Sequence, residues 1–179
     1  MNKKIVDALT EQVNIELGSA YLYLAISAAL DNLAMPGAAH WMRVQTQEEL
    51  NHAMLFMRYA IDRDEKISFP AVKIDAPKIK CMADAFTAAN EHEKFVTGSI
   101  NRLAALAADE KDFMFMNFLQ YFFTEQLEEE KNTKAVVDKL KLAGDSHNAI
   151  LFIDSELAAR PEAAPNPTGS MLTASGRGA

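Results

Sequence analysis

The chain has few of the residues that interrupt helices or build disulfide frameworks. Its 179 residues include one cysteine, seven glycines and six prolines. The single cysteine, Cys81, cannot form an internal disulfide, which fits a reducing compartment and argues against a thiolate metal site. Helix-forming Ala, Leu, Glu, Lys and Met dominate the remainder. We therefore expect an all-α protein with one domain.

An excess of positive charge is also lacking. The formal net charge is −7, and no basic face is clustered, which argues against a nucleic-acid partner because phosphate contacts need Lys and Arg. No leader of basic, apolar and small residues opens the chain, and no apolar run reaches transmembrane length. We expect a cytoplasmic protein with no membrane partner.

Apolar residues recur three and four positions apart, a spacing that predicts four long helices and a short fifth one. The expected ranges are 3–33, 38–63, 82–108, 112–142 and 146–159. Met35-Pro36-Gly37 separates the first two helices, and Gly144 is a fitting C-terminal residue for the fourth. Residues 161–179 lack periodicity and are expected to form a disordered tail after a domain of residues 1–160.

Connection lengths restrict the topology. The breaks after the first and third helices are short, so each helix pair should form an antiparallel hairpin. The proline-containing segment 64–80 could span roughly 55 Å if extended, whereas a helix of about 27 residues is only about 40 Å long. We expect this segment to run the length of the bundle and to return the third helix parallel to the second.

The core-facing stripe of each long helix is mostly apolar but carries polar residues in its middle. The first stripe comprises Leu9, Val13, Glu16, Ala20, Tyr23, Ser27 and Leu30. The second comprises Ala38, Met42, Gln45, Glu49, His52, Phe56 and Tyr59. The third comprises Phe86, Ala89, Glu93, Val96, Ile100, Leu103 and Ala107. The fourth comprises Phe115, Phe118, Phe122, Gln126, Glu129, Thr133, Val136 and Leu140.

These stripes would place four glutamates, Glu16, Glu49, Glu93 and Glu129, at one level of the core. A buried, unpaired carboxylate costs several kcal/mol or becomes neutral, and four of them would repel one another. Two divalent ions would balance four negative charges. A ligand set of oxygen atoms with one imidazole suits Fe or Mn, so we predict a dinuclear metal centre.

Two spacings strengthen this prediction. Glu49 and His52 form Glu-x-x-His, which puts both side chains on one helix face. Glu16 precedes Glu49 by 33 residues, as Glu93 precedes Gln126. The second hairpin has Gln126 and Glu129 where a symmetric centre would repeat Glu-x-x-His, so the two metal positions should be inequivalent.

Several segments resemble bacterial non-haem ferritins, and the resemblance extends over about residues 3–158. They are residues 11–17 (EQVNIEL), 47–52 (QEELNH), 117–121 (NFLQY), 124–131 (TEQLEEEK), 138–140 (DKL) and 142–144 (LAG). The resemblance implies a ferritin-like four-helix bundle with one long crossover and a short fifth C-terminal helix. It also implies an iron-storing homo-oligomer, a cage of twenty-four subunits. Each subunit would be a ferroxidase that oxidises Fe(II) with O2 or hydrogen peroxide.

The same resemblance implies roles for individual residues. One iron would be held by Glu16, Glu49 and His52, and a second by Glu49, Glu93 and Glu129. Gln126 matches a glutamine beside this centre, and Tyr23 matches a tyrosine close to it. A third, more exposed iron position would involve Glu48, Glu125, Glu128 and Glu129.

Three alternatives remain open. A haem-containing bacterioferritin would have a haem-ligating methionine at Leu50 and a second Glu-x-x-His at Gln126 and Glu129, so we expect no haem. A di-iron peroxidase of the rubrerythrin kind would need rubredoxin cysteines, which are missing. A metal-free helical interaction protein should lack central carboxylates. The other histidines lack a glutamate three residues earlier, unlike His52, and are expected at the surface or in interfaces: they are His40, His92 and His147.

Overall fold

A computed structural model of the protein describes residues 1–163, in which all regular structure is helical. The helices are α1 (Lys3–Asn32), α2 (Pro36–Asp62), α3 (Met82–Asp109), α4 (Phe113–Ala143) and α5 (His147–Leu157). The expected all-α class and the number of helices in the described residues are confirmed, with boundaries differing by two residues or fewer. The expected tail lies outside the described residues from residue 164 onward.

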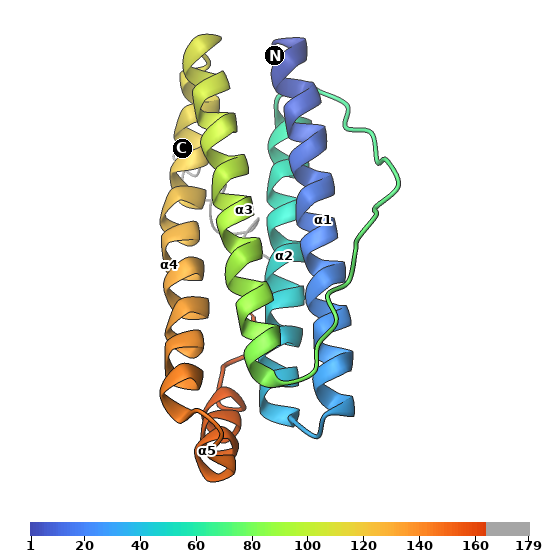
Figure 1. Cartoon of the computed structure of the whole chain (residues 1–179). Coiled ribbons are helices and arrows are strands. Elements are labelled where there is room, and N and C mark those ends of the chain that lie inside the picture. The colour runs from blue at the N-terminus through green and yellow to red at the C-terminus, as the bar shows by residue number, and fades with distance from the viewer. Residues whose placement is uncertain (164–179) are drawn as a thin grey trace, which may run out of the picture.

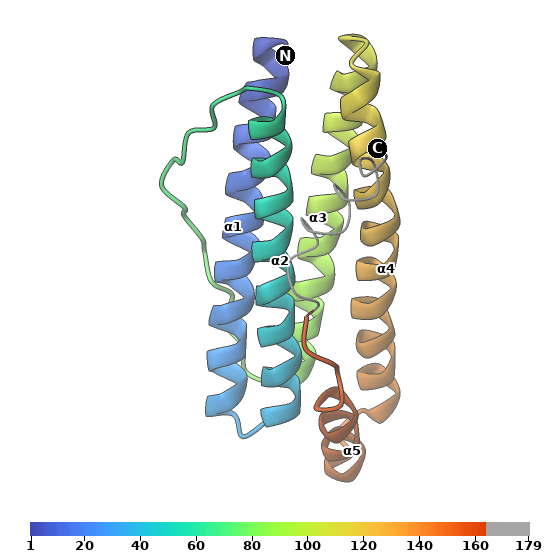
Figure 2. The same ribbon diagram turned by 180° about the vertical axis from the view of Figure 1, so that it is seen from behind.

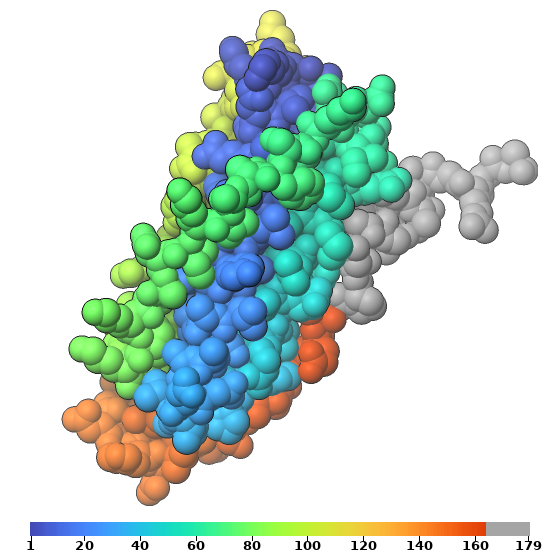
Figure 3. Space-filling model, turned by 90° about the vertical axis from the view of Figure 1, so that its right-hand side faces the viewer, coloured from blue at the N-terminus to red at the C-terminus, as the bar shows by residue number. Residues whose placement is uncertain are grey.

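The four long helices form a bundle of two antiparallel hairpins, α1–α2 and α3–α4 (Figure 1). The connection between α2 and α3 has no regular structure. It runs along the outside of α1 and α2 from one end of the bundle to the other (Figure 3). The long connection therefore returns α3 parallel to α2, as its length predicts. The short helix α5 packs at the far end of the bundle, against α2 and α4.

Side-chain caps explain why three helices begin where they do. The side chains of Asn2, Asp112 and Ser146 accept hydrogen bonds from the first-turn amides of α1, α4 and α5, which would otherwise lack partners. Gly144 follows α4 with a φ of 52°, a conformation that costs glycine little.

The predicted start of α2 at residue 38 was two residues late. Proline is tolerated in the first helical turn, and Pro36 occupies that place in α2. The residue before it, Met35, provides no side-chain cap. Instead, the Asp154 carboxylate of α5 accepts hydrogen bonds from the amides of Gly37 and Ala38 at 3.1 and 2.8 Å. A residue of α5 therefore completes the N-terminus of α2.

Glycine is required where α5 meets α2. A Cβ atom at Gly37 would lie 1.8 Å from the carbonyl oxygen of Asp154, well inside van der Waals contact. The absence of a side chain at Gly37 allows the two backbones to approach closely.

The apolar core is divided into two clusters, one toward each end of the bundle. One contains Tyr23, Leu30, Met42 and Phe86, and the other contains Leu9, Phe56, Ile100, Phe115 and Phe122. Except for Ser27, the buried polar residues of the four stripes lie between these clusters along the sequence of every long helix. The polar layer in the middle of the core is thus a feature of the fold.

Two members of the predicted stripes were wrong. Phe118 and Tyr59 are only half-buried, while their neighbours Leu119 and Ala60 are buried. A helical period of 3.6 allows a step of three or four residues, and the stripes take four here. The rings of Phe118 and Tyr59 stack on each other at 4.3 Å between centroids, which keeps them at the margin between α4 and α2.

Among the described helices, α1 is long and apolar enough to span a membrane by length and composition. The longest run without a charged residue in α1, residues 17–30 between Glu16 and Asp31, is nevertheless shorter than the roughly 20 residues that a transmembrane helix needs. The apolar residues of α1 instead form part of the bundle core, because the helix packs against α2 and α3 and buries Leu9, Val13 and Ile26.

Candidate metal centre

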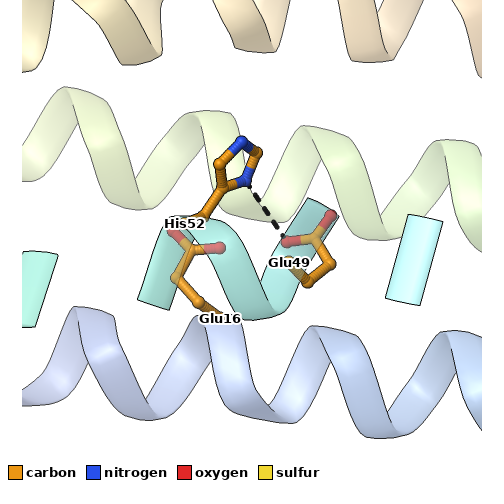
Figure 4. Close-up of side chains that lie close together, drawn as sticks. All are labelled: Glu16, Glu49 and His52. Atoms are coloured by element: carbon orange, nitrogen blue, oxygen red, sulfur yellow. Dashed lines mark ion pairs between the residues drawn. The ribbon is translucent and has the colours of Figure 1, made fainter. Parts of the chain in front are cut away.

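Three predicted ligands converge in the middle of the α1–α2 hairpin. Glu16 comes from α1, and Glu49 and His52 come from successive turns of α2 (Figure 4). All three are buried, and each offers a ligand atom within 4.8 Å of those of the other two. His52 Nδ1 lies 3.7 Å from Glu49 Oε2. The Glu-x-x-His spacing therefore places an imidazole and a carboxylate on one face, opposite a carboxylate of the neighbouring helix.

Glutamines one turn earlier orient both carboxylates. Gln12 Nε2 donates to Glu16 Oε1 at 2.8 Å, and Gln45 Nε2 donates to Glu49 Oε1 at 3.0 Å. Gln12 is itself held by Ser99, whose hydroxyl donates to Gln12 Oε1 at 2.5 Å. Each amide leaves the second oxygen of its carboxylate available to another partner.

Burial and mutual repulsion shift the protonation of this group. Burial, reinforced by the charge of Glu49, raises the pKa of Glu16 to about 8. Burial also acts to raise the pKa of Glu49, but the adjacent His52 imidazole and the Gln45 amide hold it below its ordinary value. Burial acts to lower the pKa of His52, but Glu49 and Glu16 raise it to about 10. Without a metal, the group is thus an ion pair of Glu49 and His52 beside a protonated Glu16.

The α3–α4 hairpin contributes Glu93, Gln126 and Glu129 to the same polar layer. All three are buried, and Gln126 Nε2 donates to Glu93 Oε2 at 3.2 Å. Burial, with the charges of Glu49 and Glu129, raises the pKa of Glu93 well above its ordinary value. Burial, followed by the charge of Glu49, raises the pKa of Glu129 to about 7. These carboxyl groups therefore share the electrostatic environment of Glu49.

Tyr23 also lies in this layer. It is fully buried, and its hydroxyl donates a hydrogen bond to Glu93 Oε1. Burial and the charge of Glu93 raise the pKa of Tyr23 well above its ordinary value. Its phenol is therefore a neutral donor that is in direct contact with the carboxylate of Glu93.

The donor set is suited to a metal cation. Within the described part of the chain, the buried Oε2 atoms of Glu16 and Glu129 have no hydrogen-bond partner. A buried acceptor without a donor is costly unless a cation approaches it. Carboxylate oxygens and one imidazole suit Fe(II) or Mn(II). The two free oxygens lie on different hairpins, which suits a centre with ligands from both.

Apart from the buried Glu129, the residues predicted for a third iron position lie farther out. Glu125 is half-buried, and its Oε1 is 3.9 Å from His52 Nε2. Glu128 is exposed on α4. Glu48 is half-buried and forms an ion pair with Arg160 at 2.5 Å. Burial raises the pKa of Glu48, although the Arg160 charge opposes this shift.

Sequence reasoning missed three residues that support this region: Gln12, His92 and Arg160. The sequence does contain a pattern that could have identified Gln12, because Gln12 and Glu16 repeat the four-residue spacing of Gln45 and Glu49. His92, expected at the surface or in an interface, is instead half-buried inside the subunit. Ser19 lies 2.7 Å from its Nε2 atom, and the Tyr23 ring meets it edge-on at 5.9 Å. Nothing in the local sequence pattern indicates the position of Arg160.

Comparisons with known proteins agree with this arrangement. The sequence profile of the Ferritin family, described as a ferritin-like domain, matches residues 6–143. The chain is 34% identical over 154 residues to a bacterial non-haem ferritin of Campylobacter jejuni, covering 86% of this chain and 92% of that protein. It is 36% identical over 160 residues to a bacterial non-haem ferritin of Bacteroides fragilis, covering 89% and 99%. An open-pore ferritin of Archaeoglobus fulgidus superposes with a TM-score of 0.88 at 40% identity, covering 90% and 99%.

Proposed function

The chain belongs to the ferritin family, and on that premise we propose that it stores iron and oxidises Fe(II) to Fe(III) at a di-iron centre. The observation that carries the proposal is the buried group of Glu16, Glu49 and His52. Such a group is costly in an apolar core unless a cation compensates it. Iron is the substrate here, and the centre would be a ferroxidase site.

In this proposal, Glu16 and His52 bind one Fe(II), and Glu93 and Glu129 bind the other. Glu49 bridges the two, which is supported by its influence on the pKa values of Glu16, Glu93 and Glu129. Two Fe(II) ions each give up one electron, and one O2 accepts two electrons and two protons to form hydrogen peroxide. Hydrogen peroxide can serve as the oxidant in place of O2. The carboxylates favour Fe(III) over Fe(II) because they stabilise the higher charge.

Gln126 and Tyr23 have supporting roles on the α3–α4 side. Gln126 orients the Glu93 carboxylate through its amide. Tyr23 contacts the same carboxylate, and in this proposal it supplies an additional electron. The first position has an imidazole ligand and the second only carboxylates, so the two irons should differ in affinity. Glu48, Glu125, Glu128 and Glu129 would form a third position, weaker because it is more exposed.

We also propose that the subunits assemble into a homo-oligomeric cytoplasmic cage of twenty-four copies, in which Fe(III) accumulates as a mineral. Support comes from large apolar side chains that the single subunit leaves exposed. Phe113 is 75% exposed, Leu142 90% and Phe152 66%. These side chains, at both ends of α4 and on α5, are suited to contacts with neighbouring subunits. The packing of α5 at one end of the bundle places Phe152 on an outer surface.

The test is aerobic addition of Fe(II) to metal-free protein, followed by the near-ultraviolet absorbance of Fe(III). We expect rapid oxidation of about two irons per subunit. Glu93→Gln keeps the size of the side chain but removes one ligand charge, so the initial rate should fall at least about tenfold.

The matched control is Glu91→Gln on the same helix, because Glu91 is exposed and should leave the rate unchanged. Circular dichroism and size-exclusion chromatography would establish that both variants fold and assemble. If the wild-type protein oxidises iron no faster than buffer does, the buried carboxylates have another purpose and the proposal is wrong.

A further inference from the structure

The described residues after α5, 158–163, turn back beside α2 (Figure 2). Arg160 lies on this segment. Its carbonyl oxygen is 2.8 Å from His40 Nε2, and its guanidinium carbon lies 4.0 Å from the centroid of the Trp41 ring. Cation–π contact and a backbone hydrogen bond therefore hold the residue against α2 at two points.

The guanidinium group makes three further polar contacts on α2. It donates to the Trp41 carbonyl at 3.2 Å, to Gln45 Oε1 at 3.0 Å and to Glu48 Oε2 at 2.5 Å. Trp41, Gln45 and Glu48 are four and three residues apart, so they share one helix face. The side chain is only 15% exposed. Arg160 is thus a fixed cation on the face of α2 that leads to Glu49.

Gln45 connects Arg160 to the bridging carboxylate. Arginine has only donors, so the Gln45 oxygen must face Arg160 and the Gln45 amide nitrogen must face away. That nitrogen donates to Glu49 Oε1. The orientation of the amide is therefore determined from both ends, and Arg160 is a positioning residue for Glu49 through Gln45.

The same cation neutralises Glu48, one of the residues proposed for the third iron position. A metal ion binding there would have to displace the guanidinium group or share its carboxylate. We propose that Arg160 is a tethered counter-cation that competes with a third metal ion at Glu48 and so keeps that position weaker than the di-iron centre. This inference rests on the proposed function and goes beyond it, because the competing cation belongs to the chain itself.

The test is anaerobic isothermal titration calorimetry of the metal-free, assembled protein with Zn²⁺, which binds such ligands without redox chemistry. Wild type should bind two ions tightly and any further ion weakly. Arg160→Gln should tighten the weak class about tenfold, because it removes one positive charge next to a carboxylate. Arg160→Lys retains the charge and should stay within about threefold of wild type.

Two further variants separate competition from a structural effect. Lys139→Gln removes the Lys139–Glu156 ion pair at 2.8 Å, which links α4 to α5 away from the centre, and should leave all zinc classes unchanged. In a Glu48→Gln background, Arg160→Gln should no longer tighten the weak class of zinc sites, because the carboxylate for which Arg160 and the metal ion compete has been removed.

The outcomes distinguish the two proposals. If wild type and Arg160→Gln bind two ions tightly and have the same weak class, the Arg160 inference is overturned and the di-iron proposal stands. If Arg160→Lys and Arg160→Gln tighten the weak class equally, packing rather than charge is responsible, and the inference is also overturned. If wild type binds no tight zinc, the proposed function itself fails.

Discussion

Metal binding at the centre should expel protons, and their number follows from the pKa values of its ligands. A metal ligand must be deprotonated to bind. The perturbation is the addition of two equivalents of Zn²⁺ per subunit to metal-free protein at pH 7. Glu49, with its lowered pKa, is already ionised and should contribute nothing. The protons must come from the ligands whose pKa values are raised.

Each contribution can be estimated separately. Glu16, with a pKa of about 8, is about nine-tenths protonated at pH 7. His52, with a pKa of about 10, carries its extra proton almost completely. Glu129, with a pKa of about 7, is about half protonated. These three ligands should together release about 2.4 protons per subunit. Glu93, whose pKa is raised well above its ordinary value, adds to this number, so at least about two protons are expected in total.

Calorimetry in several buffers of different ionisation enthalpy measures this number directly, because the observed heat varies with the protons that the buffer takes up. The release should fall by about one proton between pH 7 and pH 9, since Glu16 and Glu129 then ionise before zinc binds. Glu16→Gln should release about one proton fewer at pH 7. Glu11→Gln, at an exposed position of the same helix, should match wild type. A release below about one proton at pH 7 would refute the reasoning, because the buried carboxyl groups would then already be charged.

Three further predictions concern stability and turnover. Gly37→Ala should lower the free energy of unfolding by about 2–4 kcal/mol in chemical denaturation, because its Cβ would overlap the Asp154 carbonyl. The control is Gly98→Ala, whose Cβ would meet only the flexible end of an arginine side chain at 3.7 Å. This control should be neutral or stabilising by up to about 1 kcal/mol. Metal-free protein should melt at a lower temperature at pH 8 than at pH 5. The Glu16 carboxyl group has a pKa of about 8 in the folded protein and about 4.5 in the unfolded chain. The stability that it contributes below pH 4.5 is therefore lost as the pH rises toward 8. An unchanged or higher melting temperature at pH 8 would contradict this. Tyr23→Phe should abolish any tyrosyl radical signal in electron paramagnetic resonance during iron oxidation; a signal of wild-type intensity would assign the radical to another residue.

Much of the fold could be predicted because it depends on local periodicity. The spacing of apolar residues predicted every helix, and the polar residues in the middle of each stripe predicted a polar layer in the core. The wrong stripe members, Phe118 and Tyr59, lie near one end of the bundle, where steps of three and four residues both satisfy the helical period. The long connection between α2 and α3 was predictable because its reach exceeds the length of a helix.

The candidate site was predictable to a similar extent. Glu16, Glu49, His52, Glu93, Gln126 and Glu129 all occupy stripe positions, and the structure buries each of them. Only the structure, however, brings the ligand atoms of Glu16, Glu49 and His52 within 4.8 Å. It also separates the outer glutamates, since Glu48 is paired with Arg160 whereas Glu128 is exposed.

By itself, the sequence determined which residues are helical and which helical face carries the polar layer, because both follow from backbone geometry over a few residues. The tertiary structure alone decided contacts between residues far apart in the chain: Asp154 capping α2, His92 beside Tyr23, and Arg160 against Gln45 and Glu48. No periodic pattern encodes these contacts. They depend on how whole helices pack, and in particular on where α5 meets the start of α2.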